Sequence, residues 1–294
     1  MSLNLEAVGS SFGLIERSWT STDCLLYALG VGAGSLDPAD SELAFTTENS
    51  TGVTQKVLPT FATVAASFTG GVLSLAGTEE HEGPLGSFDP AMLVHGEHAI
   101  ELYGSLPTEA TISTTGVIAG IYDKVTGALV VIDAESVDTA TGKPIFSSTV
   151  GLFIRGEGGF GGDRGPSWTK DRSTSGPPDQ VVRYPTRPDQ ALLFRLSGDR
   201  NPLHSDPVFA KRAGFERPIL HGLCSYGFAG RALLHALCDS DPARFRSMRG
   251  RFRHPVYPGD ILTTSIWIDA PTARYRVQNQ QGHTIIDAGS ATFV

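Results

Sequence analysis

The stretch ILHGLCSYGFAGRALLHAL, residues 219–237, decides the fold of this chain. It has the length of a helix, and apolar side chains fall on nearly every face of that helix. A helix that is apolar all round is buried, so we expect this segment to form a central helix. Glycine and alanine are spread through it, and these small residues would let a sheet pack closely against the helix.

Alternating apolar and polar residues follow the central helix and predict strands over residues 249–256, 261–268, 273–279 and 284–294. Before the helix, Asp206 can cap a short helix that has Pro207 in its first position and Gly214 past its end. A long helix followed by a meander of strands indicates an α+β fold, in which an antiparallel sheet wraps on the helix.

The two halves of the chain resemble each other. Residues 25–30 (LLYALG) parallel residues 192–197 (LLFRLS), and residues 57–60 (VLPT) parallel residues 219–222 (ILHG). Strand and hairpin patterns recur between residues 99 and 154. A duplicated unit explains this order. We therefore expect an N-terminal domain, a polar linker rich in Gly and Pro, and a C-terminal domain, over residues 1–155, 156–181 and 182–294.

Composition excludes several classes of protein. The 294 residues carry a net charge of −8 and are 40% hydrophobic, which favours a folded, acidic protein and disfavours binding to nucleic acid or anionic membranes. We expect no signal peptide and no membrane span. The chain has three cysteines and no Cys-x-x-Cys pair, which favours a cytoplasmic location. Scattered histidines without an HExxH motif predict that no metal is bound.

Residues 156–161 match the GxGxxG pattern of dinucleotide-binding loops and follow a predicted strand. That pattern binds a dinucleotide only where a helix begins in the loop. Here the chain continues into Gly165, Pro166, Pro177 and Pro178, so we reject a dinucleotide site.

The segment FRLSGDRNPLH, residues 194–204, contains Asp199, Asn201 and His204 in a loop punctuated by Gly198 and Pro202. Asp and His together can hold a water molecule and move its protons, and their surroundings decide which is acid and which is base. Asn201 can fix the geometry without titrating. On residue type alone, turn formation explains Asp199 and Asn201 equally well.

The wider pattern resembles the MaoC-like family, and more specifically its type 2 (R)-specific enoyl-CoA hydratases. The resemblance rests on GDRNPLH, SDP, AGF and PILHG in the second half, on YALGVG, FTTE, LPTF and HGE in the first, and on GGFGG between them. It implies a double hotdog fold, with a catalytic second hotdog and a first hotdog that holds the acyl chain. The implied reaction is the reversible hydration of trans-2-enoyl-CoA to (3R)-3-hydroxyacyl-CoA, without a cofactor, and we expect a homodimer.

The resemblance also implies site residues. Asp199 and His204 would share the water, with Asn201 beside them. Gly222 stands at the predicted helix start, where a free backbone N–H can stabilise an oxyanion, although it could also serve packing alone. Contacts with the substrate map to His95, Gly96, Lys124, Arg200, Pro202, Leu203 and Phe252.

Some of these positions keep a second interpretation. Lys124 could be a solvated turn lysine, and Phe252 lies in a basic strand that could equally be an ordinary solvated face. Glu48 matches a glutamate that matters for activity in relatives, but a structural role in tying the two hotdogs together explains this residue equally well. Gly32 aligns with Asp199, so the first half lacks the pair and we expect one active site per chain.

Two other functions fit the same sequence. One is a (3R)-hydroxyacyl-acyl carrier protein dehydratase, which could use the same pair of side chains. The other is a non-catalytic hotdog protein that binds acyl-CoA, although such a protein would not need a water-activating pair. The preferred chain length, and which of Asp199 and His204 is the base, stay open.

Overall fold

The computed structural model describes residues 2–36, 42–66, 83–89, 92–166 and 176–294. Its strands are β1 (Ser2–Leu3), β2 (Ser11–Trp19), β3 (Gly86–Ser87), β4 (Leu93–Leu102), β5 (Ala110–Asp123), β6 (Gly127–Asp138), β7 (Pro144–Arg155), β8 (Gln180–Pro185), β9 (Phe245–Phe252), β10 (Ile261–Asp269), β11 (Thr272–Gln278) and β12 (Thr284–Phe293).

The α-helices are α1 (Ser21–Gly30), α2 (Leu43–Thr46), α3 (Ala62–Ala65), α5 (Gln190–Phe194), α6 (Pro207–Arg212) and α7 (Gly222–Cys238). Short 3-10 helices are η1 (Leu5–Ala7), η2 (Pro59–Phe61), η5 (Arg195–Ser197), η6 (Pro202–His204) and η7 (Pro242–Arg244). No helix among the described residues is long and apolar enough to cross a membrane.

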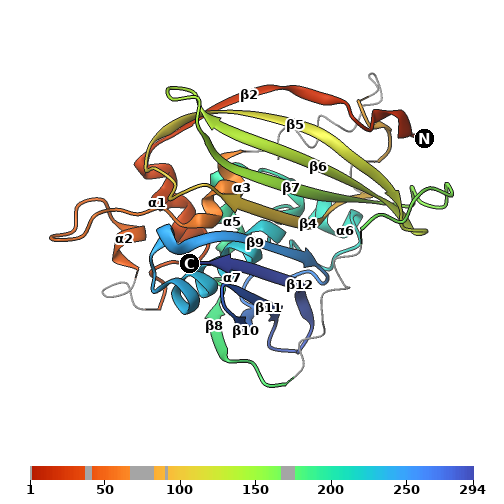
Figure 1. Ribbon diagram of the computed structural model, residues 1–294. Helices are drawn as coiled ribbons and strands as arrows, with labels where there is room; N and C mark the ends of the chain where they lie inside the picture. The colour runs from red at the N-terminus through yellow and green to blue at the C-terminus, as the bar shows by residue number, and fades with distance from the viewer. Residues whose placement is uncertain (1, 37–41, 67–82, 90–91, 167–175) are drawn as a thin grey trace.

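The strands of both halves form one continuous antiparallel sheet, in the order β2-β5-β6-β7-β4-β9-β12-β11-β10-β8 (Figure 1). The first five strands in this order come from the first half and the last five from the second. We predicted one sheet per half. In the structure the two sheets join edge to edge, because β4 pairs with β9, with Glu97 opposite Arg251 and Glu101 opposite Ser247. This pairing satisfies backbone groups that two separate sheets would leave at open edges.

Helix α7 confirms the predicted central helix, and it begins at Gly222, the predicted helix start, three residues after the apolar run begins at Ile219. It is buried along nearly its whole length and packs against β9, β10 and β12. We expected the glycines of α7 to allow close approach of the sheet, but two of them, Gly227 and Gly230, face the first half of the chain instead. A Cβ at Gly230 would lie 2.3 Å from Cγ2 of Thr60, and one at Gly227 would lie 2.4 Å from Cγ1 of Val31. The small residues of α7 therefore allow close contact with the first half of the chain.

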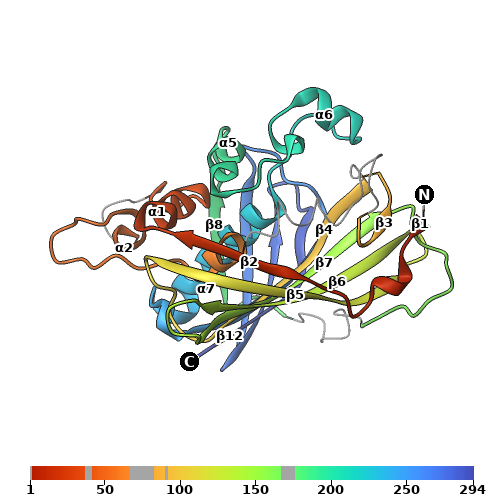
Figure 2. The same cartoon turned by 90° about the horizontal axis from the view of Figure 1, so that it is seen from above.

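The structure repeats local geometry at the positions that align between the halves. Leu58, before η2, has φ −63° and ψ 132°, and His221, before α7, has φ −58° and ψ 137°. The segments 25–30 and 192–197 lie in α1 and in α5 with η5, which contact each other. Seen from above, α1, α5 and α6 lie on one side of the sheet (Figure 2).

The Asp206 side chain accepts hydrogen bonds from the backbone of Val208 and Phe209 at the start of α6, which confirms the predicted cap.

The predicted linker lies between β7 and β8. Its described residues 156–166 form no helix or strand, and residues 167–175 lie outside the described part. Strand β8 already begins at Gln180, within the predicted linker.

Candidate active site

A cavity of about 630 Å³ opens between the two halves of the molecule. The loop before α6 and the start of α7 supply one wall, which contains Asp199, Asn201, His204 and Gly222. The other walls come from β4 and β7 of the first half and β9 of the second. Because both halves supply walls, neither encloses the site alone.

Local hydrogen bonds shape the loop that carries Asp199 and His204. The Asp199 carboxylate accepts from the backbone N–H of Asn201 at 3.1 Å, and the Asn201 side chain accepts from the N–H of Leu203 at 3.0 Å. Gly198, with φ +131°, takes a left-handed conformation that side chains disfavour. The Asn201 side chain thus stabilises the loop, and η6 turns His204 toward Asp199.

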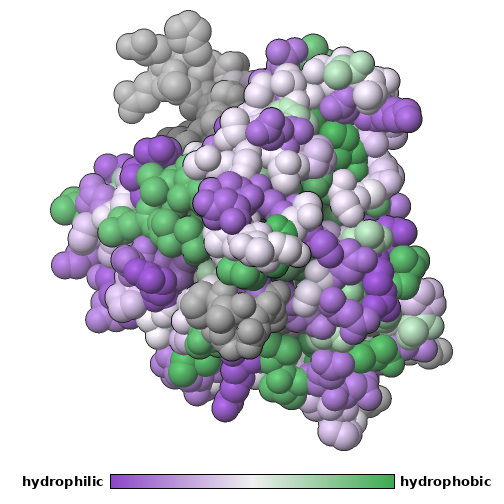
Figure 3. Space-filling model, turned by 90° about the vertical axis from the view of Figure 1, so that its left-hand side faces the viewer, coloured by the Kyte–Doolittle hydropathy of each residue, from purple (hydrophilic) through white to green (hydrophobic). Residues whose placement is uncertain are grey.

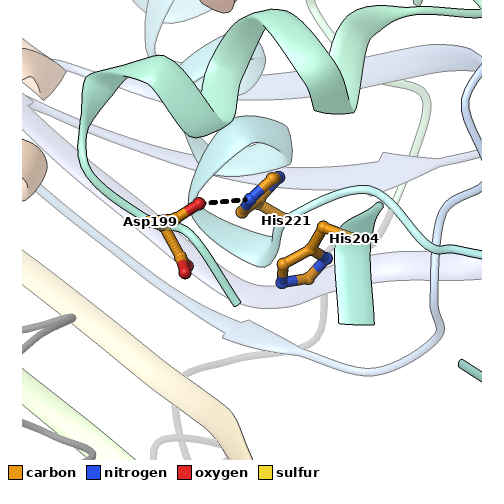
Figure 4. Close-up of side chains that lie close together, drawn as sticks. All are labelled: Asp199, His204 and His221. Atoms are coloured by element: carbon orange, nitrogen blue, oxygen red, sulfur yellow. Dashed lines mark hydrogen bonds between the residues drawn. The ribbon is translucent and has the colours of Figure 1, made fainter. Parts of the chain in front are cut away.

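The side chains of Asp199 and His204 face each other in Figure 4. His204 Nδ1 donates to the carbonyl of Ile219 at 2.9 Å, so Nε2 carries the free lone pair. A carboxylate oxygen of Asp199 and a ring nitrogen of His204 lie within 4.8 Å of each other. One water molecule with hydrogen bonds of about 2.8 Å can therefore bridge them.

Burial lowers the pKa of His204, although the Asp199 carboxylate and the Ile219 carbonyl oppose this shift. The side chain is only 9% exposed, and a buried imidazolium loses its hydration. His204 is therefore neutral at physiological pH and can accept a proton.

Gly222 is the first residue of α7, where the backbone N–H has no partner within the helix. The partial positive charge of the helix start lies at the same point. Phe252 covers this glycine, since a Cβ there would lie 3.4 Å from Cε1 of the ring. The N–H thus lies in an apolar, partly desolvated corner of the cavity, which strengthens its interaction with a developing oxyanion.

The structure brings together most of the predicted substrate contacts. His95, Gly96, Lys124, Leu203 and Phe252 all line the cavity. The ring of His95 lies 5.2 Å from that of Phe252, and burial lowers the pKa of His95 to about 4. Arg200 and Pro202 are exposed and are not among the residues that line the cavity.

Two family models match the chain, the MFE-2 hydratase 2 N-terminal domain over residues 18–156 and the MaoC like domain over residues 170–288. The chain belongs to the MaoC-like family. The 3-hydroxyacyl-thioester dehydratase Y of Mycobacterium tuberculosis is 41% identical over 100% of this chain and 99% of its own length. The peroxisomal enoyl-CoA hydratase 2 of Arabidopsis thaliana is 38% identical over 92% of this chain and 89% of its own.

Among solved structures, a MaoC-like dehydratase from Phytophthora capsici matches with a TM-score of 0.83 and 30% identity, over 99% of this chain and 98% of that one. The predicted α+β double hotdog is thereby confirmed for this MaoC-like chain.

Glu48 does not tie the two hotdogs together through any contact that the structure records. Its side chain is exposed and it is not among the residues that line the cavity. Glu42 forms the tie instead, because its buried carboxylate accepts from Arg231 and His235 of α7. The sequence held a signal for this pair, since an arginine in the middle of an apolar helix needs a buried partner.

The first hotdog of this MaoC-like chain has no second catalytic pair among its described residues. Gly32, which aligns with Asp199, has φ +76°, and a Cβ there would lie 2.6 Å from the ring of Phe228. The Arg231 guanidinium occupies the neighbouring space and donates to the carbonyl of Val31 at 2.7 Å. The space beside Gly32 is therefore filled by side chains of α7.

The glycine-rich loop after β7 binds a carboxylate of the chain itself. Backbone N–H groups of Gly159 and Gly161 donate to Asp123 at 2.9 and 2.8 Å. The same carboxylate accepts from Val125 at 2.7 Å in the hairpin before β6. No helix begins in the described part of this loop, which agrees with the rejection of a dinucleotide site.

Asp199, His204 and His221 have the donor types of a metal site, and their ligand atoms lie within 4.8 Å of one another. The two imidazole rings are stacked, however, with 28° between their planes. Ring lone pairs lie in the ring plane, so nearly parallel rings do not direct them toward one point. The absence of a bound metal stays a prediction.

Proposed function

We propose that this protein hydrates trans-2-enoyl-CoA to (3R)-3-hydroxyacyl-CoA in fatty acid metabolism, in a reversible reaction that needs no cofactor. The observation that carries the proposal is the approach of an Asp199 carboxylate oxygen and a His204 ring nitrogen to within 4.8 Å, in the same cavity as the free N–H of Gly222. The names of the Arabidopsis and mycobacterial relatives support a hydro-lyase that acts on acyl thioesters.

The chemistry follows from this arrangement. The thioester carbonyl of the substrate accepts a hydrogen bond from Gly222 N–H, which makes C3 electrophilic and stabilises the enolate that forms when C3 is attacked. Water held by Asp199 and His204 supplies a hydroxyl that bonds to C3. The water proton passes to the pair and from there to C2, so that H and OH are both added and nothing is oxidised or reduced.

Cationic side chains at the cavity support the coenzyme A form of the substrate. Lys124, Arg155 and Arg253 line it, although the protein as a whole is acidic. Arg253 pairs with Asp287 at 3.4 Å, but its side chain is 52% exposed, so part of its guanidinium still faces solvent, where a ligand can reach it. Phosphates of CoA are anionic and bind such groups through charge-assisted hydrogen bonds.

The alternative substrate is the acyl carrier protein thioester, and the name of the mycobacterial relative fits both forms. A non-catalytic acyl-CoA-binding protein is disfavoured, because such a protein needs no aspartate and histidine side by side in its cavity.

The deciding experiment follows enoyl absorbance with crotonyl-, octenoyl- and hexadecenoyl-CoA and with one matching carrier-protein thioester. Product chirality is read by (3R)- and (3S)-specific dehydrogenases. We expect faster turnover of the CoA forms and a (3R) product, because the Gly222 N–H fixes the enoyl plane while the water approaches one face. A racemic or (3S) product, or turnover of the carrier-protein form alone, would refute this proposal.

A homodimer and a cytoplasmic location complete the proposal. Leu29, Leu192 and Leu196 are exposed and surround a second hollow between α1 and α5, a surface that a second copy could cover. Figure 3 shows apolar patches on the side of the molecule that carries α1 and α2. The three buried, unpaired cysteines fit a reducing compartment. Light scattering tests the homodimer, and fluorescence microscopy of the tagged protein tests the cytoplasmic location.

A further inference from the structure

His221 lies at the point where the parts of the candidate active site meet. It is the last residue before α7, directly before Gly222, and its side chain is only 1% exposed. The proposed chemistry gives it no role, because the water lies between Asp199 and His204 and the oxyanion donor is a backbone N–H.

Its imidazole contacts both members of the pair. The ring stacks on that of His204 with 3.7 Å between centroids and 28° between planes. Nε2 donates to the backbone carbonyl of Asp199 at 3.2 Å, the bond drawn as a dashed line in Figure 4. The ring of Phe194 lies 4.9 Å from that of His221, so a third element limits its movement.

The protonation state of His221 follows from these contacts. Burial lowers its pKa well below the ordinary value, the nearby His204 and Arg195 lower it further, and the bond to the Asp199 carbonyl opposes them. The ring is therefore neutral, with its proton on Nε2, because a carbonyl can only accept. A neutral ring can lie against His204 without repelling it when His204 takes up a proton.

We propose that His221 is a positioning residue, whose ring supports the imidazole of His204, whose Nε2–H holds the Asp199 loop, and whose backbone sets the start of the helix at Gly222. This inference rests on the proposed hydratase function. One residue thereby fixes the proton-transfer pair and the oxyanion donor relative to each other. Misplacement of reacting groups by 1 Å can cost about 100-fold in rate.

Two variants separate the two side-chain contacts. His221→Phe keeps an aromatic ring against His204 and loses the donor to Asp199. His221→Gln keeps an N–H donor at a similar distance and loses the stacked ring. In both we expect kcat on crotonyl-CoA to fall about 10- to 100-fold, with KM changed less than about threefold because neither variant alters a group that binds CoA.

The pH profile distinguishes positioning from a general loss of structure. Without the ring, water reaches His204 in His221→Gln, so the burial that lowers the His204 pKa is relieved. His204 is then protonated at a higher pH than in the wild type, so the acid limb of the kcat/KM profile moves to higher pH. In His221→Phe the ring remains and the limb should stay where it is. His283→Gln, at an exposed hairpin, is the matched control.

A measurement on the wild-type protein tests the proposal even if both variants unfold. Nitrogen NMR of labelled histidines should show His221 neutral and protonated on Nε2 at about pH 5.5, where an ordinary imidazole is mostly charged. Titration of His221 near 6.5, or a proton on Nδ1, would overturn the proposal, as would variants with wild-type kcat and pH profile. An inactive wild type would instead refute the hydratase function, while the NMR result would still test the arrangement.

Discussion

Arg231 and Glu42 form a buried, bidentate ion pair that joins the two hotdogs, with Nε–Oε1 and Nη2–Oε2 distances of 2.7 and 3.0 Å. The side chains are only 1% and 6% exposed. The arginine comes from the central helix α7 and the glutamate from the segment before α2. His235, one turn further along α7, donates to the same carboxylate at 2.9 Å. Arg231 of this pair lies beside Gly32, the residue of the first hotdog that aligns with Asp199.

Glu42→Gln should destabilise the protein by about 3–5 kcal/mol, because the Arg231 charge is left buried without a counter-charge. Denaturant unfolding of the purified variant measures this free energy. The double variant Glu42→Gln/Arg231→Met should be more stable than Glu42→Gln alone, since it also removes the stranded charge. Asp189→Asn breaks the exposed pair with Arg187 and is the control that should change little. Equal stability of Glu42→Gln and wild type would contradict the interpretation.

The Glu42 carboxylate also makes the stability of the protein depend on pH. Burial alone would raise the pKa of Glu42, but hydrogen bonds from His235 and the charge of Arg231 outweigh it and lower the pKa from 4.5 to about 2. A lowered pKa in the folded state means that the stabilisation is complete above 4.5 and is lost as pH falls toward 2. The free energy of unfolding should decrease over this window in the wild type and less steeply in Glu42→Gln. Parallel curves for both proteins would exclude Glu42 as the cause.

Asp199→Asn and His204→Gln should each lower kcat by about 10²–10⁴, in line with the loss of a general acid or base. Both side chains lie in a loop at the cavity, so the fold should survive, which circular dichroism and thermal melting would verify. Each variant removes one of the two groups that hold the water. Near-normal turnover by either folded variant would rule out the pair as the proton-transfer groups.

Separated from the first half, residues 167–294 should be poorly soluble or inactive on long acyl chains. The fragment keeps Asp199, His204 and α7 but loses β4, which pairs with β9 and contributes His95 and Gly96 to the cavity. An open strand edge and an uncovered apolar face both favour aggregation. Sedimentation and activity with hexadecenoyl-CoA are the measurements. A soluble fragment with full long-chain activity would show that the first hotdog does not shape the pocket.

The sequence alone determined the features that depend on neighbours along the chain. Helical length and apolar character predicted α7, alternation predicted the strands that follow it, and Asp206 with Pro207 predicted the start of α6. The short loop with Asp199 and His204 could be recognised because both residues lie within six positions of each other in the sequence.

The tertiary structure alone decided the features that depend on residues far apart in the chain. Periodicity does not reveal which strand edges meet, so the joining of the sheets through β4 and β9 was missed. An arginine within the apolar helix needs a buried acidic partner, and Glu42 and Glu48, which lie close together in the sequence, could each supply it. Only the fold shows that Glu42 is buried against Arg231 and that Glu48 is exposed. His221 is part of a motif in the sequence, and only the fold shows that its ring stacks on that of His204, seventeen residues earlier. Local pattern specifies elements, whereas burial and charge pairing between distant segments depend on how those elements pack.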